Sequence, residues 1–207
     1  MKLVNLSVKE FVDTLASNTP APGGGSVSAL AGATGCGLFA MAGELTFHKK
    51  AFKALDEHQK KAFKDTIDRY KRNKEKMLQY VDEDTVAFNQ LMSAFRMPKE
   101  SDEDKSKRLM AIKRATMETI RVPMEVCQLA LESLRDVDKV MPFANKNTIS
   151  DQEVGVLMLH SAIEGSAKNV LINLSGLKEE KLVRAYEKEI GLIQEEAKSL
   201  REMFLQK

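Results

Sequence analysis

A run of three glycines followed by a serine, Gly23–Ser26, is the first place in this sequence where a ligand could bind. Because glycine has no Cβ, the backbone N–H groups of such a turn are open to close contact, and a predicted helix begins directly after it. The helix dipole favours a carboxylate or a phosphate at that position. Short glycine runs also occur where two segments only need to pack tightly, so both interpretations stay open. No Gly-Lys-Ser/Thr follows, which excludes a P-loop.

An aspartate inside an apolar seam is the second candidate. In a predicted long helix, Asp84 shares its seven-residue spacing with Tyr70, Met77 and Leu91, so its carboxyl group is expected to face the interior. Burial disfavours the charged form and moves the pKa towards neutrality, which is what a general acid or base requires. The alternative is a structural ion pair, for example with Lys74 of the same seam.

A ridge of small and amide side chains is the third candidate. It repeats every four residues in a helix predicted to begin at a capping box near Ser150, and comprises Ser161, Gly165, Asn169 and Asn173. The ridge is suited to face a second small ridge, made of Ser28, Gly32, Cys36 and Ala40. Inward amides either order a heterocyclic ligand or only tie two helices together. Asp151, in the first turn of the same helix, is suited to complement its dipole.

Metal and nucleophile chemistry is not expected. The three histidines, His48, His58 and His160, have no carboxylate or histidine partner at helical spacing, which disfavours zinc and di-iron sites. Cys36 and Cys127 lie in apolar stretches without a neighbouring base, so neither a disulfide framework nor an activated thiol is indicated, and a reducing compartment fits.

Helical periodicity dominates the chain, and no window alternates as a strand does. Helices are expected over about 7–17, 25–47, 55–96, 101–140 with a kink or division at Pro123, 150–174, and a last segment with a heptad-like apolar stripe over 183–204. The prediction is an all-α, multihelical bundle of long antiparallel helices that forms a single domain over residues 1–207.

Composition excludes several classes of protein. Of 207 residues, 43% are hydrophobic and 30% charged, and 32 Lys and Arg against 30 acidic residues give a net charge of +2, so no nucleic-acid partner is expected. The segment 18–43 has no charged residue, but its prolines and seven glycines favour a buried helix over a membrane span. The N-terminus lacks the pattern of a signal peptide, and a cytoplasmic location is expected.

The segment Thr19–Ser26 and the small-residue helix through Met41 strongly resemble the cyclodeaminase/cyclohydrolase family of tetrahydrofolate enzymes. Further similar segments follow in the expected order over about residues 7–174: Leu45-Thr46 with Lys49-Lys50, Asp84–Phe88 with Pro98-Lys99, Val122-Pro123, and Ser150-Asp151 through Leu174. Phe47-His48 departs from the pattern, because a small residue is expected before the lysine pair, and His48 there could alter access to a folate.

The resemblance implies a dimeric, all-helical protein that acts on a reduced folate without a bound cofactor. Cyclodeaminases convert 5-formiminotetrahydrofolate to 5,10-methenyltetrahydrofolate and ammonia, whereas cyclohydrolases add water to the methenyl form and give 10-formyltetrahydrofolate. The sequence does not choose between the two reactions. A different hypothesis is a non-catalytic helical module that oligomerises through the last apolar stripe.

The resemblance also assigns roles to the candidate residues. Asp84 would transfer protons, the glycine turn would hold the polar edge of the substrate, the lysine pair would meet its anionic glutamate tail, and the remaining polar residues would orient the pterin. A solvated helix end is the alternative for the lysine pair. The candidate substrate-binding residues are Pro22, Gly23, Gly24, Gly25, Ser26, Lys49, Lys50, Asp151, Asn169 and Asn173.

Overall fold

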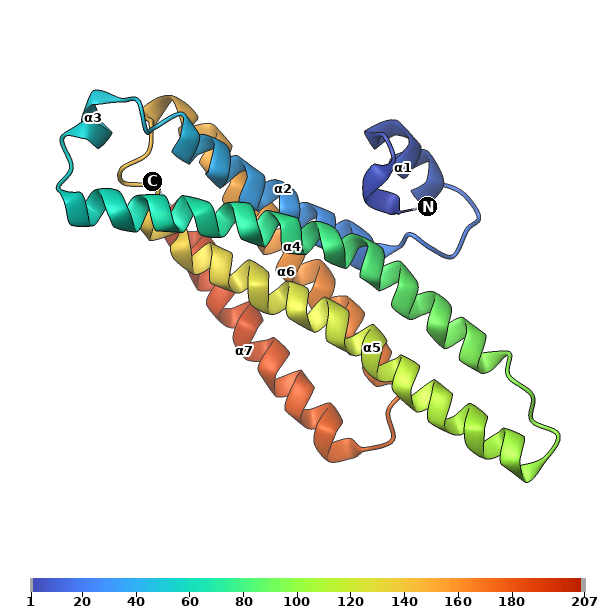
Figure 1. Cartoon of the computed structure of the whole chain (residues 1–207). Helices are drawn as coiled ribbons and strands as arrows, with labels where there is room; N and C mark the ends of the chain where they lie inside the picture. Colours follow the sequence, from blue (N-terminus) through green and yellow to red (C-terminus); the bar gives the residue numbers. More distant parts are fainter. Residues whose placement is uncertain (1, 206–207) are drawn as a thin grey trace.

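The computed structural model of the protein describes residues 2–205, and all regular structure in that range is helical, as predicted (Figure 1). The helices are α1 (Val8–Leu15), α2 (Gly24–Glu44), α3 (Lys50–Lys53), α4 (Glu57–Phe95), α5 (Asp102–Arg135), α6 (Ile149–Leu174) and α7 (Glu180–Leu205), with 3-10 turns at Leu3–Asn5, Asp136–Lys139 and Lys146–Thr148. The five long helices form a bundle. The α4–α5 hairpin extends past the other helices at one end.

Polar caps start the helices that the sequence marks most clearly. Ser7 and Glu10 form a capping box at the start of α1, and equivalent boxes start α4 at Asp56 and α5 at Ser101. The predicted box at Ser150 is wrong. A 3-10 turn leads directly into α6, so that helix already begins at Ile149 and Ser150 lies inside it.

Helix α2 is central, because it packs against both α4 and α6. A Cβ at Gly32 would lie 2.9 Å from Met77 Sδ of α4, and one at Gly35 would lie 2.9 Å from Leu159 Cγ of α6. The predicted meeting of the two small ridges is confirmed at one pair, since a Cβ at Gly165 would lie 2.2 Å from Ser28 Oγ. Among the described helices, α2 alone is long and apolar enough to cross a membrane, and its place between two helices explains that composition.

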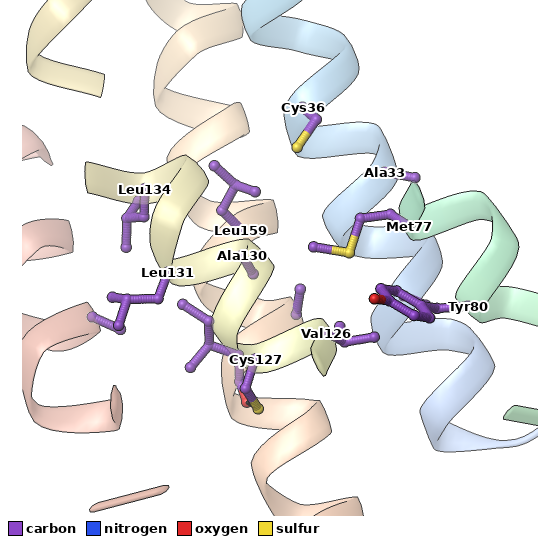
Figure 2. Close-up of a cluster of buried hydrophobic side chains, with 14 of the residues drawn as sticks. Ala33, Cys36, Met77, Tyr80, Val126, Cys127, Ala130, Leu131, Leu134 and Leu159 are labelled. Carbon is purple, nitrogen blue, oxygen red and sulfur yellow. Dashed lines mark hydrogen bonds between the residues drawn. The ribbon is translucent and has the colours of Figure 1, made fainter. Parts of the chain in front are cut away.

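The core gathers side chains from α2, α4, α5 and α6, as Figure 2 shows. Cys36 and Cys127 are both buried and free within this core, and burial raises the pKa of each thiol to about 12. Both cysteines therefore serve as small apolar side chains. Helix α5 runs unbroken through Pro123, so the alternative in which this proline divides the helix is wrong.

The apolar stripe of α7 is used inside the chain. Its residues Ile190, Ile193 and Ala197 are buried, and Val183, Tyr186, Leu200 and Phe204 pack against the same core. A stripe that is already covered by its own bundle is not free to join two copies, which counts against a module that oligomerises through it.

Candidate functional site

A cavity of about 260 Å³ lies where the first turn of α2 meets α4, α5 and α6. It is lined by Pro20, Ala21, Gly23, Gly24, Gly25, Asp84, Phe88, Thr119, Asn169, Ile172 and Asn173. The structure therefore brings together residues that the sequence offered as three separate candidates. A larger groove of about 600 Å³ lies between the far ends of α4 and α5, but its lining includes no carboxyl, imidazole or thiol group.

The carboxyl group of Asp84 rests directly on the glycine turn. The Ser26 hydroxyl donates to Asp84 Oδ2 at 2.9 Å, and a Cβ at Gly25 would lie 2.0 Å from Asp84 Oδ1. Only glycine leaves room for the carboxyl group here, so the close approach of α2 and α4 depends on Gly25.

Burial raises the pKa of Asp84 above the usual range of an aspartate. The hydroxyl and backbone N–H of Ser26 oppose this rise, because hydrogen bonds to a carboxylate favour its charged form. The proposed partner Lys74 instead pairs with Glu75 at 2.8 Å, and no ion pair reaches Asp84 from residues 2–205. The structural ion pair with Lys74 is therefore wrong, and Asp84 is a half-buried acid that titrates within a cavity.

Two amides of α6 form the opposite side of the cavity. Asn169 Nδ2 donates to the Gly165 carbonyl at 2.8 Å, and a Cβ at Gly24 would lie 3.3 Å from that nitrogen. Asn173 Nδ2 donates to the Thr119 carbonyl of α5 at 2.7 Å. Asn173 thus ties two helices together and lines the cavity, which combines both interpretations of the amide ridge.

The cavity also includes residues that the sequence did not single out. Phe88 lies one helical turn after Asp84, a spacing that could have identified it as a wall of the same site. Pro22 is buried next to the cavity without lining it, while Ser26 contacts it through Asp84. Among the described residues, no three His, Cys, Asp or Glu side chains gather in a way that could hold a metal ion.

Lys49, Lys50 and Asp151 do not reach this cavity within one chain. Helices α2 and α6 are antiparallel, since Gly24 meets Asn169 near one end and Gly35 meets Gly155 further along. The lysine pair follows the end of α2 and Asp151 opens α6, so all three lie at the other end of the bundle, about 30 Å away at 1.5 Å per residue. Within one chain the structure therefore does not bring these three residues to the glycine turn, and their contact with the substrate stays a prediction.

Comparison with known proteins assigns this arrangement of helices to a family. The chain is 30% identical to methenyltetrahydrofolate cyclohydrolase of Methylorubrum extorquens, over 96% of this chain and 93% of that protein. It is 36% identical to formimidoyltransferase-cyclodeaminase of Dictyostelium discoideum over 92% of this chain, which spans only 34% of that longer protein. The identity to the formimidoyltransferase-cyclodeaminase of Gallus gallus is 30%, again over about a third of that protein, 36%.

Structure and family model agree with these relatives. The solved structure of formiminotetrahydrofolate cyclodeaminase from Thermotoga maritima matches with a TM-score of 0.77 at 27% identity, covering 97% of this chain and 92% of that one. The family model described as formiminotransferase-cyclodeaminase matches residues 7–191. This chain therefore belongs to the formiminotransferase-cyclodeaminase family, within which its relatives are folate one-carbon cyclodeaminases and a cyclohydrolase.

Proposed function

We propose that this protein converts 5-formiminotetrahydrofolate to 5,10-methenyltetrahydrofolate and ammonia. The observation that carries the proposal is the carboxyl group of Asp84, which is half-buried in a small cavity, free of any described cation and raised in pKa. A group of this kind can accept and return one proton during turnover. A solved structure that matches the chain is that of a cyclodeaminase, which favours this reaction over its hydrolytic counterpart.

One carboxyl group is enough to balance the protons of this reaction. The formimino group enters as the amidinium, with its nitrogen already protonated. N10 of the substrate attacks the formimino carbon, a new C–N bond forms as the C=N double bond becomes a single bond to an amino group, and the proton of N10 passes to the Asp84 carboxylate. Asp84 then returns that proton to the amino group on the same carbon. The C–N bond to ammonia breaks, and the methenyl cation remains bridged between N5 and N10. The Ser26 hydroxyl donates to the carboxylate before the first transfer and after the second.

The rest of the cavity is suited to hold the substrate. The bare backbone of Gly23 and Gly24 at the start of α2 allows close contact with polar atoms, and the Phe88 ring supplies an apolar wall. In this proposal Asn169 and Asn173 orient the pterin. The reduced folate is the substrate, with no bound cofactor, and the protein acts in the cytoplasm without a nucleic-acid or membrane partner.

The direct assay follows the methenyl chromophore. Purified protein is mixed with 5-formiminotetrahydrofolate, and separately with 5,10-methenyltetrahydrofolate, each against an enzyme-free control. Chromophore that forms faster than the control in the first mixture supports the proposal. Accelerated loss in the second mixture alone indicates a cyclohydrolase, the reaction named for the relative from Methylorubrum extorquens that this chain matches over nearly its whole length.

Replacement of the acid tests its role. Asp84→Asn keeps the shape and the hydrogen bond from Ser26 but cannot take a proton, so turnover is expected to fall by roughly 10²- to 10⁴-fold. Calorimetry should still detect reduced-folate binding by the variant. Asp65→Asn, an exposed position on the same helix, is the control and should turn over like the unmodified protein. Unimpaired turnover in Asp84→Asn would remove this residue from the mechanism.

We also propose that the protein works as a homodimer joined along the outer side of α2. That side exposes Val27, Thr34 and Met41 and carries no charge, and a Cβ at Gly37 would meet nothing within 4 Å. Gly37 lies equally far in sequence from Gly24 and Lys50. An antiparallel crossing of two α2 helices at Gly37 would bring the lysine pair of one copy near the glycine turn of the other, where the glutamate tail of a folate would lie.

A further inference from the structure

The carbonyl oxygen of Thr119 lacks the partner that a regular α-helix would provide. In such a helix each carbonyl accepts the N–H of the residue four positions later. Four positions after Thr119 stands Pro123, which has no N–H to donate. Both residues are buried, so a donor from elsewhere in the protein is favoured to satisfy this oxygen.

Asn173 of α6 supplies that donor. Its Nδ2 lies 2.7 Å from the Thr119 carbonyl oxygen, and because a carbonyl only accepts, the atom that faces it must be the amide nitrogen. The Thr119 hydroxyl does not compete, since it donates to the Thr116 carbonyl at 2.9 Å. Pro123 thus leaves a carbonyl open on α5, and the amide plane of Asn173 is fixed by occupying it.

This arrangement decides which atoms α6 presents to a ligand. Asn169, one turn earlier, also donates a hydrogen bond from its amide nitrogen to a backbone carbonyl, that of Gly165. No donor within residues 2–205 reaches the Oδ1 atom of either asparagine. Since both side chains line the cavity, its α6 wall offers two hydrogen-bond acceptors and matches the edge of a heterocycle that carries several N–H groups.

We propose that Pro123 is a positioning residue for the substrate, because the carbonyl that it leaves open holds Asn173 with its Oδ1 free to accept from the amino and ring N–H groups of a pterin. The inference rests on the proposed function, since it names how the same cavity orients its reduced folate. Pro123 itself does not line the cavity and acts only through Thr119 and Asn173.

Binding of 5-formyltetrahydrofolate, a stable reduced folate, tests the inference by calorimetry. Pro123→Ala restores an N–H that competes for the Thr119 carbonyl, so the Kd should rise roughly tenfold, as for the loss of about one hydrogen bond. The Tm should hold or rise, because alanine is the better helix former. Affinity and stability therefore move in opposite directions, which a purely structural role for Pro123 would not produce.

A double-mutant cycle makes the test specific. Asn173→Ala should raise the Kd to a similar extent, and the double variant should bind no more weakly than Asn173→Ala alone, because both changes remove the same interaction. Val122→Ala, a buried neighbour in the same turn, is the control and should keep the original Kd. An unchanged Kd in Pro123→Ala, or losses that add in the double variant, would overturn the inference.

If Pro123→Ala does not fold, Asn173→Asp tests the same hydrogen bond between the Asn173 side chain and the Thr119 carbonyl. Its carboxylate oxygens are repelled by the Thr119 carbonyl, so a raised Kd is expected, and an unchanged Kd would overturn the inference. Failure of the unmodified protein to bind the folate would instead remove the proposed function, and this inference with it.

Discussion

Asp84 and Gly25 show at the scale of single residues how the site constrains the fold. The carboxyl group lies where its helix otherwise buries apolar side chains, and Ser26 is the hydroxyl that supports it. Because burial raises the pKa of Asp84, the ionised form is less favourable in the folded chain than in the unfolded one. The proposed function therefore costs stability at any pH where Asp84 is charged.

The cost of this charge predicts how Asp84→Asn changes stability with pH. The folded-state pKa lies above the unfolded one, so the contribution of Asp84 to stability is greatest at low pH and is lost as the pH rises through the folded pKa. Asparagine has no such loss. Denaturant unfolding should find the variant more stable than the unmodified protein at neutral pH, with a difference that shrinks towards acid pH. A difference that grows on acidification would contradict the raised pKa.

Gly25 provides a second test at the same scale. A methyl group in Gly25→Ala would collide with the Asp84 carboxyl, so overpacking should cost about 1–3 kcal/mol of unfolding free energy and impair the site. Gly191→Ala is the matched control, because a Cβ at that exposed position of α7 meets nothing within 4 Å. The control should gain roughly 0.5–1 kcal/mol from better helix propensity. Equal effects of the two substitutions would show that helix propensity, not contact with Asp84, explains Gly25.

The elements themselves follow closely from local sequence. Apolar periodicity predicts α1, α4 and α5 to within a few residues, because this signal acts within one or two turns, and the structure adds the capping boxes that start them. Prediction from local sequence fails where contacts with another element determine where a helix begins or ends. Ser150 resembles an N-cap but lies inside α6, and Pro123 does not divide its helix, where a side chain from α6 satisfies the carbonyl that the proline leaves open.

At the scale of the whole molecule, the sequence predicts the members of the site better than their grouping. Asp84, the glycine turn and the α6 amides each carry a local signal, but their meeting depends on the antiparallel order of α2 and α6. The same order sends Lys49, Lys50 and Asp151 to the other end of the bundle. The spacing of residues along the chain does not show which ends of two helices lie together. A family resemblance can therefore identify these residues as candidates without showing where they lie in the fold.

The proposed dimer gives the prediction for the whole molecule. Thr34→Arg places a charge in the middle of the apolar outer side of α2, so sedimentation should show a monomer where the unmodified protein is a dimer. Asn89→Arg, at an exposed position of α4, is the control and should remain dimeric. If Thr34→Arg sediments as a dimer, another surface joins the copies.

The two hydrogen bonds that shape the cavity join residues far apart in the chain. Ser26 and Asp84 are 58 positions apart, and Thr119 and Asn173 are 54 apart. Contacts of such long range require the intervening chain to close into a loop, and the entropy cost of that closure makes them form later than the local contacts of a helix. A refolding chain therefore acquires most of its helices before it acquires any site. Ligand binding during refolding would therefore show that α2, α4, α5 and α6 have packed together, and not only that the helices have formed.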